Sequence, residues 1–199
     1  MNSCVTIACV LSPGPLYTSW HVDRLKDMVA QHMSQPYQFV CVDDSKFPGW
    51  WAKIDLFKPG RFTGRVLYLD LDSTVIGSLD DIANHKHPSL FSMMENFKEF
   101  KEPNKARLNS SVMAWDAEKA NHLFTEFTPS VMERLNGDQN WISEQMPDAA
   151  TFPEDLCVSY KVRRAKLKTI PKDARVVCYH GNPKPWDLPS DHLEGFTFV

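Results

Sequence analysis

Residues 66–72 read Val-Leu-Tyr-Leu-Asp-Leu-Asp. The apolar residues 66–69 predict a buried strand, which ends in Asp70 and Asp72. Side chains two residues apart on a strand point to the same face, so the two carboxylates would lie close together. A cation would relieve their repulsion, and carboxylate oxygens suit hard ions such as Mg²⁺ or Mn²⁺. A lone Asp-x-Asp also arises by chance, with one aspartate capping a turn and the other in solvent.

Apolar runs alternate with helix-like spacing along the rest of the chain. We expect strands at residues 5–11, 37–42, 90–94, 112–115 and 174–179, and helices at 17–33, 50–57, 79–83, 138–146, from 116 to about 127 and again beyond Pro129. Asp116 is placed to cap the helix that follows it, and the polar residues 95–107 predict an exposed loop or lid. Strands separated by helices predict an α/β sheet with parallel pairs. Functional residues of such sheets gather at the carboxyl ends of the strands.

Composition excludes several classes of protein. The chain has 199 residues and a formal charge of −3, which predicts one domain over residues 1–199 and gives no basic excess for binding nucleic acid. The longest apolar run near the start, residues 5–11, is too short to span a bilayer and follows no basic residue. We therefore expect no transmembrane segment and no secretory signal, and hence a soluble, cytoplasmic protein. Five cysteines without a Cys-x-x-Cys pair predict reduced core residues and no zinc ribbon or thioredoxin-like redox motif.

A second polar cluster, residues 180–186 (His-Gly-Asn-Pro-Lys-Pro-Trp), follows the last predicted strand. A neutral imidazole such as that of His180 can ligate a metal ion beside carboxylates. Gly181 lets the backbone approach a phosphate closely, and Lys184 supplies a positive charge to phosphate oxygens. A lone histidine in a loop is more often a surface residue, but together with the Asp-x-Asp pair this cluster predicts a diphosphate clamp.

Two kinds of enzyme carry an Asp-x-Asp at the end of a strand. In one, both carboxylates hold a divalent ion that bridges the diphosphate of a nucleotide-sugar. In the other, the first aspartate is a nucleophile that accepts a phosphoryl group and the second is a general acid. The run Asp-Leu-Asp-Ser-Thr-Val at residues 70–75 resembles the first motif of the haloacid dehalogenase phosphatases. That family begins its sheet with this motif and needs a late acidic pair, whereas here two predicted strands come first and no acid follows the last strand until Asp187.

The ordered set of motifs resembles the GT-A glycosyltransferases, particularly glycosyltransferase family 8, the glycogenin and bacterial galactosyltransferase type. The set covers most of the chain and comprises Tyr17, Lys53, residues 66–75, Leu79-Asp80-Asp81-Ile82, Asn109-Ser110-Ser111-Val112-Met113 with Asp116, Asp138-Gln139, and residues 180–186. The resemblance implies a Rossmann-like GT-A fold with a mixed, mostly parallel central sheet flanked by helices. It also implies a metal-dependent transferase that moves a hexose from a nucleotide-sugar, most simply a UDP-sugar, to a hydroxyl of a saccharide or other acceptor, with retention at the anomeric carbon.

The same resemblance implies roles for individual residues. Asp70, Asp72 and His180 would hold Mn²⁺ or Mg²⁺. The nucleotide-sugar would be bound by Leu11, Ser12, Tyr17 and Asp43 or Asp44 near the base, by Leu71 between the two aspartates, by Gly181 and Lys184 at the diphosphate, and by Lys53, Asn109 and Ser110 around the sugar. The predicted catalytic residues are Asp138 and Gln139, which would lie near the reacting carbon, and Lys184.

Several of these roles have a simpler structural alternative. Tyr17 could be a core residue on a helix face, Asn109-Ser110 could form a turn before a strand, and Asp138 could be the N-cap of the helix that follows it.

The sequence departs from the family pattern at two places. His180 and Lys184 are closer together than in the usual His-x-x-Gly-x-x-Lys-Pro-Trp, and Ser111 replaces the glycine of Asn-Ser-Gly. The chain also lacks the family's larger acceptor-side additions, which predicts a small acceptor or one presented by a partner. Two other functions stay open: a phosphohydrolase with Asp70 as nucleophile, and a non-catalytic module that binds sugar nucleotides or glycans.

Overall fold

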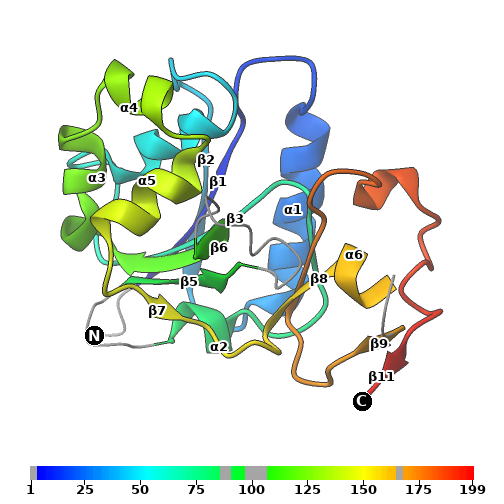
Figure 1. Ribbon diagram of the computed structural model, residues 1–199. Helices are drawn as coiled ribbons and strands as arrows, with labels where there is room; N and C mark the ends of the chain where they lie inside the picture. The colour runs from blue at the N-terminus through cyan, green and yellow to red at the C-terminus, as the bar shows by residue number, and fades with distance from the viewer. Residues whose placement is uncertain (1–3, 86–90, 97–106, 165–167) are drawn as a thin grey trace.

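The computed structural model describes residues 4–85, 91–96, 107–164 and 168–199, and Figure 1 shows its elements. The strands are β1 (Val5–Val10), β2 (Tyr37–Val42), β3 (Arg65–Leu69), β4 (Ser73–Val75), β5 (Phe91–Glu95), β6 (Leu108–Asp116), β7 (Ala150–Thr151), β8 (Cys157–Ser159), β9 (Thr169–Ile170), β10 (Val176–Cys178) and β11 (Thr197–Phe198). The α-helices are α1 (Ser19–His32), α2 (Asp80–Ala83), α3 (His122–Thr125), α4 (Pro129–Arg134), α5 (Asp138–Gln145) and α6 (Tyr160–Val162), and the 3₁₀ helices are η1 (Gly49–Phe57), η3 (Ala117–Ala120) and η5 (Pro185–Asp187).

A six-stranded sheet in the order β2-β1-β3-β6-β5-β7 forms the centre of the fold. β1 pairs in parallel with β2 and β3, and β5 pairs in parallel with β7, whereas β6 is antiparallel to both β3 and β5. Every residue of β1 is buried, as its unbroken apolar sequence predicts for a strand covered on both faces. The α/β class and the mixed, mostly parallel sheet are therefore confirmed.

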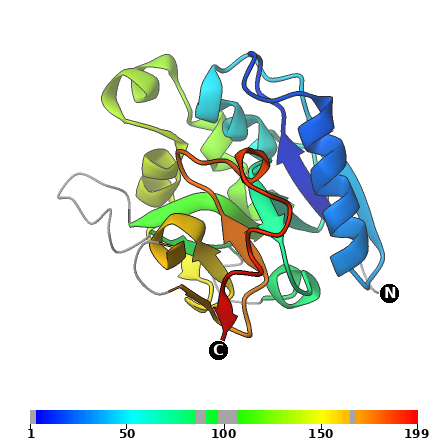
Figure 2. The same ribbon diagram turned by 90° about the vertical axis from the view of Figure 1, so that its right-hand side faces the viewer.

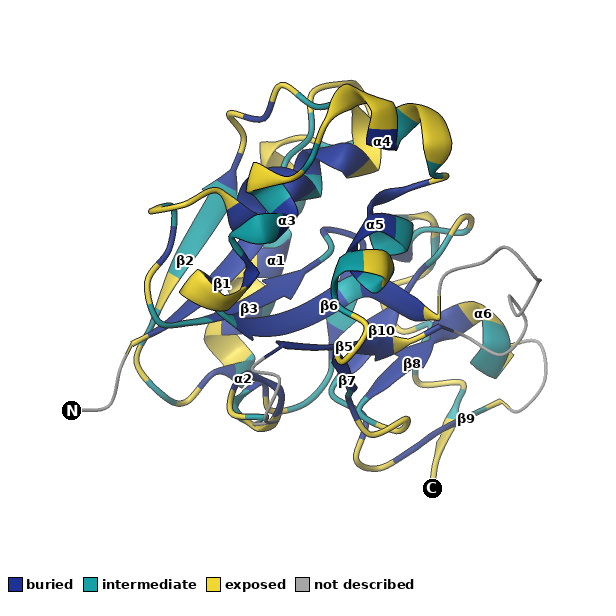
Figure 3. Ribbon diagram, turned by 60° about the vertical axis from the view of Figure 1, so that its left-hand side comes forward, coloured by how far each residue is buried: buried dark blue, intermediate teal, exposed yellow. Residues whose placement is uncertain are grey.

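Helices cover both faces of this sheet (Figures 1 and 2). On one face Tyr68 and Trp115 pack in a cluster that includes buried residues of η1, α3 and α5. On the other face Ile7 and Leu67 pack with Leu25 of α1 and with residues of α2. Figure 3 shows the buried strands β1, β3 and β6 between these layers. Burial of apolar side chains on both faces is the main source of stability for such a sheet.

A second, smaller sheet in the order β4-β10-β8 lies beside the first. The predicted strand at residues 174–179 is present as the shorter β10, but it belongs to this sheet instead of the central one. Its own apolar cluster includes Tyr160 and Tyr179, whose rings stack with centroids 4.7 Å apart. The chain enters this sheet directly from β3, so the Asp-x-Asp sequence stands at the junction of the two sheets.

The predicted helix after Asp116 is interrupted. It is divided into η3 and α3, and α4 follows beyond Pro129. Asp116 occupies the N-cap position of η3 but makes no side-chain cap, so the predicted capping role is wrong. Arg65 is its register partner on β3 and donates to its carboxylate at 3.2 Å. This cross-strand charge pair takes the place of the cap.

Other expectations have mixed outcomes. Residues 97–106 of the predicted loop at 95–107, and Leu90 of the predicted strand, lie outside the described residues, and Glu95 belongs to β5. All five cysteines are free, but Cys4 is exposed, so the expectation of a core position is wrong for that residue. Among the described residues, no helix is both long and apolar enough to cross a membrane.

Candidate active site

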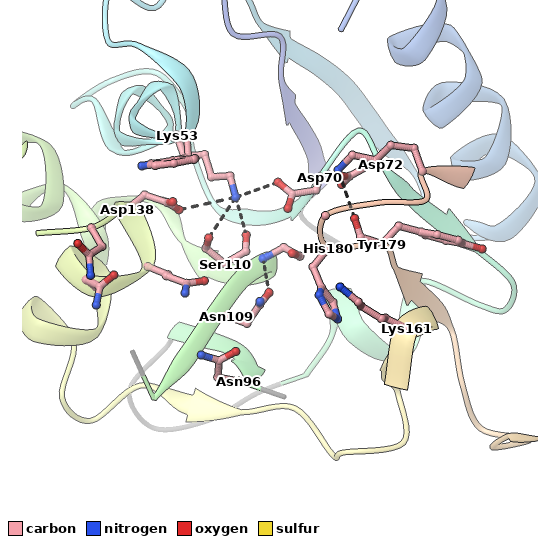
Figure 4. A pocket seen from close by; sticks show the side chains of 18 residues that line it. Lys53, Asp70, Asp72, Asn96, Asn109, Ser110, Asp138, Lys161, Tyr179 and His180 are labelled. Atoms are coloured by element: carbon pink, nitrogen blue, oxygen red, sulfur yellow. Dashed lines mark hydrogen bonds and ion pairs between the residues drawn. The ribbon is translucent and has the colours of Figure 1, made fainter. Parts of the chain in front are cut away.

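Polar side chains from separate parts of the chain line one pocket of about 580 Å³ (Figure 4). They come from the turn after β3, from β6, from the start of α5, from η1 and from the segment after β10. The predicted site residues that line the pocket are Lys53, Asp70, Asp72, Asn109, Ser110, Asp138, Gln139, His180, Gly181 and Lys184. The structure therefore brings the Asp-x-Asp pair and the late His-Gly cluster into one cavity.

Strand pairing explains why His180 lies beside the aspartates. Residues 70–72 form a tight turn in which the amide of Ser73 donates to the carbonyl of Asp70 at 3.1 Å. The turn leads into β4, which is antiparallel to β10 with Ser73 opposite Cys178. Continuing this register places residues 179 and 180 opposite residues 72 and 71. Two short apolar strands thus position the polar residues at their ends.

A strand irregularity positions the sugar-side candidates. The pairing of β5 with β6 changes register between Met93 and Met94, which pair with Met113 and Asn109. Residues 110–112 of β6 therefore bulge relative to β5, a feature that often re-aims side chains near functional sites. Ser110 lies in this bulge, and both it and Asn109 belong to a strand, so the turn alternative for them is wrong.

Lys53 stands at the centre of one group of charges (Figure 4). Its ammonium lies 2.9 Å from a carboxylate oxygen of Asp70 and 3.7 Å from one of Asp138, and it donates to the hydroxyl of Ser110 at 3.1 Å. Burial opposes the charge on Lys53, but the carboxylates of Asp138 and Asp70 outweigh burial and raise its pKa above the ordinary value. Burial also raises the pKa of Asp138, even though Lys53 favours its charged form. Two carboxylates thus share one buried cation.

Asp72 is held by a separate pair of donors. The ammonium of Lys184 forms an ion pair with its carboxylate, and the hydroxyl of Tyr17 donates to the same oxygen at 3.0 Å. Burial and the charge of Asp70 raise the pKa of Asp72, whereas Lys184 lowers it. Burial and the charge of Asp72 raise the pKa of Tyr17, so its hydroxyl stays protonated and remains a donor. The two aspartates of the motif therefore each pair with a different lysine.

The pocket contains suitable ligand types for a divalent cation. Asp70 and Asp72 offer carboxylate oxygens and His180 offers a ring nitrogen. In the present arrangement Nε2 of His180 lies 2.6 Å from the hydroxyl of Ser159, and the carboxylates face lysines. Consistent with this, the described residues hold no group of three or more His, Cys, Asp or Glu side chains gathered closely enough to bind an ion. The residues fit a cation by ligand type, and holding one requires the lysine–carboxylate pairs to open.

Some predicted nucleotide-binding residues lie away from this pocket lining: Leu11, Ser12, Tyr17, Asp43 and Leu71. Leu71 is buried in the apolar cluster beneath α1, and Asp43 is exposed just beyond β2. Tyr17 precedes α1, contacts Trp186 edge-on with ring centroids 5.9 Å apart, and reaches the site through Asp72. Tyr17 is therefore not simply a core residue on a helix face, because its hydroxyl donates a hydrogen bond to a carboxylate of the site.

The pocket also contains residues to which the sequence patterns assigned no role: Trp50, Asn96, Ser111, Asn136, Gly137, Asn140, Lys161 and Tyr179. Those at 136–140 belong to one polar run, Asn-Gly-Asp-Gln-Asn, whose concentration of amides was an available signal. Trp50 and Lys161 have no local signal, because they reach the pocket only through the packing of η1 and α6. Gly137, and not Asp138, occupies the N-cap position of α5, so the capping alternative for Asp138 is wrong.

Comparisons with known proteins identify the fold. No protein-family model and no curated protein matches the sequence. The galactosyltransferase LgtC, solved with donor and acceptor sugar analogues, superposes with a TM-score of 0.68 and 16% identity over 91% of this chain and 89% of that chain. The glycosyltransferase GlyE of Streptococcus pneumoniae TIGR4 superposes with a TM-score of 0.69 and 14% identity over 94% of this chain and 57% of that chain. A glycosyltransferase involved in glycosylation of the major capsid of PBCV-1 superposes with a TM-score of 0.58 and 14% identity over 96% of this chain and 98% of that chain.

These matches show that the chain has the GT-A glycosyltransferase fold, and they confirm the sequence resemblance at the level of the fold. The chain spans most of LgtC but only 57% of GlyE. The strand that carries the Asp-x-Asp, β3, is the third along the chain, in contrast to the first-strand position that is usual for the phosphatase alternative.

Proposed function

We propose that this chain is a glycosyltransferase that moves a hexose from a UDP-sugar to a hydroxyl acceptor with retention of the anomeric configuration. The observation that carries the proposal is the charge arrangement of one pocket on a GT-A fold. Asp70, Asp72, His180 and Lys184 line it together with Asp138. A basic group and a cation-binding pair suit a diphosphate, whose charge both can neutralise.

Lys184 is the residue that couples donor binding to the aspartates. In this structure its ammonium pairs with Asp72. The oxygens of an incoming diphosphate compete with this carboxylate for the ammonium, because both are strong acceptors for a lysine. The carboxylate that is released joins Asp70 and His180 as the set that would hold Mn²⁺ or Mg²⁺. Such an ion, when bound, supplies Lewis-acid stabilisation of the departing diphosphate, and Lys184 adds a second positive charge.

Asp138 is suited to the sugar end of the donor. Its Oδ2 atom is buried and has no hydrogen-bond partner among the described residues, although Nζ of Lys53 lies 3.7 Å away. A buried carboxylate oxygen without a hydrogen bond is unfavourable. It can stabilise the positive charge that develops at the reacting carbon as the leaving diphosphate departs. Gln139, the next residue, and the amide of Asn109 offer hydrogen bonds to sugar hydroxyls.

The pairing of carboxylates favours retention over inversion. Inversion requires a carboxylate that acts as a general base on the acceptor hydroxyl. Among the described residues that line the pocket, the carboxylates are those of Asp70, Asp72 and Asp138, and each is paired with a lysine ammonium. Each of the three thus has a lysine ammonium beside it, in the place that an acceptor hydroxyl would need for direct contact with a general base.

The release of UDP from UDP-glucose and UDP-galactose tests the proposal. We expect turnover by the wild type with Mn²⁺, its loss after chelation, and at least about a 100-fold reduction in Asp72→Asn. Asp173→Asn, an exposed carboxylate outside the pocket, is the matched control and should turn over normally. Full metal-dependent turnover by Asp72→Asn would refute the ligand assignment.

The same proteins separate the two other functions. A phosphohydrolase would cleave 4-nitrophenyl phosphate, lose that activity in Asp70→Asn and bind no nucleotide-sugar. A binding module would show a higher melting temperature with a UDP-sugar, because the ligand favours the folded state, but would release no UDP with any acceptor.

A further inference from the structure

One rim of the pocket differs chemically from the charged end. It surrounds the start of α5, and we call it the amide–indole rim; its members are Trp50, Asn136, Gln139 and Asn140. None of these four side chains carries a charge. The lining residue Lys161 lies on the other side of the pocket, next to His180 (Figure 4). The rim therefore suits a ligand that is uncharged and rich in hydroxyl groups.

Trp50 leaves a large apolar surface open at this rim. It is 59% exposed, whereas its neighbour Trp51 is 7% exposed and packs in the core. Core packing thus accounts for one of the two tryptophans and not for the other. An indole combines a flat apolar face with one polar N–H group, and covering that face releases water. A pyranose ring presents C–H groups on one face and hydroxyls at its edge, which matches an indole flanked by amides.

The indole lies against a glycine. A Cβ built on Gly137 would lie 3.2 Å from Nε1 of Trp50 and 3.4 Å from Cδ1. The backbone at Gly137 is extended, with φ 178°, a conformation that any residue adopts. Glycine at this position therefore allows the indole to approach closely, and its backbone conformation does not itself require a glycine.

The rim adjoins the proposed position of the reacting carbon. Trp50 and Lys53 are three residues apart on the 3₁₀ helix η1, so their side chains leave the helix on the same side. Gly137 directly precedes Asp138, and Lys53 contacts both Asp138 and Asp70. A molecule that stacks on Trp50 would therefore lie beside the sugar end of a donor whose diphosphate occupies the charged end.

We propose that the amide–indole rim is the acceptor subsite, and that its ligand is a neutral saccharide whose pyranose face stacks on Trp50. The amides of Asn136 and Asn140 bind its hydroxyls. The role of this saccharide as the acceptor rests on the proposed glycosyltransferase function. Its binding, however, is measurable without any transfer.

Ligand-observed NMR with and without UDP tests the subsite. The probes are methyl glucosides, methyl galactosides, lactose, maltose and cellobiose. We expect at least one of them to bind the wild type, with its dissociation constant raised about tenfold in Trp50→Ala, since aromatic stacking and area burial are both lost. Trp20→Ala is the matched control, because Trp20 is 54% exposed and lies outside the pocket lining; it should bind the saccharide as the wild type does.

Gly137→Ala provides a second variant that keeps the indole. The added methyl group must displace Trp50 by a few tenths of an ångström, so we expect weaker saccharide binding with little change in melting temperature. In the double variant Trp50→Ala/Gly137→Ala, the glycine change should have no further effect on binding, because it acts through the indole.

Three results would overturn the assignment: no neutral probe binds, Trp50→Ala binds as the wild type does, or glucuronate and glucose 6-phosphate bind more tightly than neutral sugars. The last result would place acceptor recognition at Lys161. If a neutral saccharide binds in a Trp50-dependent way but no UDP-sugar binds, the proposed transferase function fails and the saccharide site stands.

Discussion

Replacing Lys53 by methionine tests whether one lysine holds the site together. The change keeps the length of the side chain and removes its charge. Lys53 is 12% exposed at its side chain, and its partners Asp70 and Asp138 are 20% and 6% exposed. Removing one partner of a buried ion pair leaves an uncompensated charge and lowers the free energy of unfolding by about 3–5 kcal/mol. For a chain of this length that corresponds to a fall in melting temperature of roughly 6–20 °C.

The loss should depend on pH. Burial already raises the pKa of Asp138 above its ordinary value of 3.8, and without Lys53 this pKa rises further. A carboxyl group whose folded-state pKa is raised destabilises the fold as pH increases above the unfolded value. Lys53 itself stays charged in the wild type throughout this range, because its pKa is raised. The gap between wild type and Lys53→Met should therefore be small near about pH 4.5 and large near about pH 7.5.

Urea unfolding at both pH values provides the measurement. The double variant Lys53→Met/Asp138→Asn should recover at least half of the loss at neutral pH, because a neutral amide does not need a cation beside it. A gap that is the same at both pH values, or a total loss below about 1 kcal/mol, would refute the shared-cation reasoning. Strict additivity of the two substitutions would refute it equally, since residues in one charge group are expected to couple.

Two further predictions concern stability. Gly77→Ala should lower the free energy of unfolding by about 1–3 kcal/mol, because the new Cβ would lie 2.7 Å from Cδ of Arg175 and 3.0 Å from the carbonyl oxygen of Ala174; thermal unfolding measures this. Asp80→Ala should cost about 1 kcal/mol at neutral pH, because the Asp80 carboxylate accepts hydrogen bonds from the amide and the hydroxyl of Ser34. Partial burial opposes the charge of Asp80, but these hydrogen bonds outweigh burial and lower its pKa. The stabilisation by Asp80 is therefore present above the ordinary value of 3.8 and disappears as pH falls through the lowered pKa.

Each of these two predictions has its own control. Gly195→Ala places a Cβ in ordinary contact, with the nearest atom 3.9 Å away, and should leave the melting temperature nearly unchanged. An equal effect at both glycines would show that helix or turn propensity, and not the contact at Gly77, is responsible. For Asp80→Ala, a difference from the wild type that persists in full at acid pH would argue against a charge-dependent contribution.

Local patterns predicted the elements whose burial is simple. Residues 5–11 form β1 up to Val10, because an unbroken apolar run must be covered on both faces. Residues 37–42 form β2 as expected, although this strand lies at the edge of the sheet and is only partly buried. The helix expected at 17–33 is α1, whose buried residues Leu25 and Val29 follow the helical repeat. Where the local pattern was ambiguous, contacts with residues far apart in the chain determined the structure. The carboxylate of Asp116, for example, accepts a hydrogen bond from Arg65 and does not cap the helix that follows it.

The candidate site divides in the same way. The sequence predicted the chemical groups that could bind a metal ion or a phosphate, because a strand end with two carboxylates and a late His-Gly…Lys cluster are local features. The arrangement depends on contacts between residues that are far apart in the chain. The antiparallel pairing of β4 with β10 places His180 beside the aspartates.

The sequence by itself thus determined the α/β class and the chemical groups of the pocket. Only the tertiary structure decided which lysine pairs with which aspartate and that Trp50 lies open at the rim. The physical reason is that electrostatic pairing and burial depend on distance in space, and strand register and layer packing set these distances.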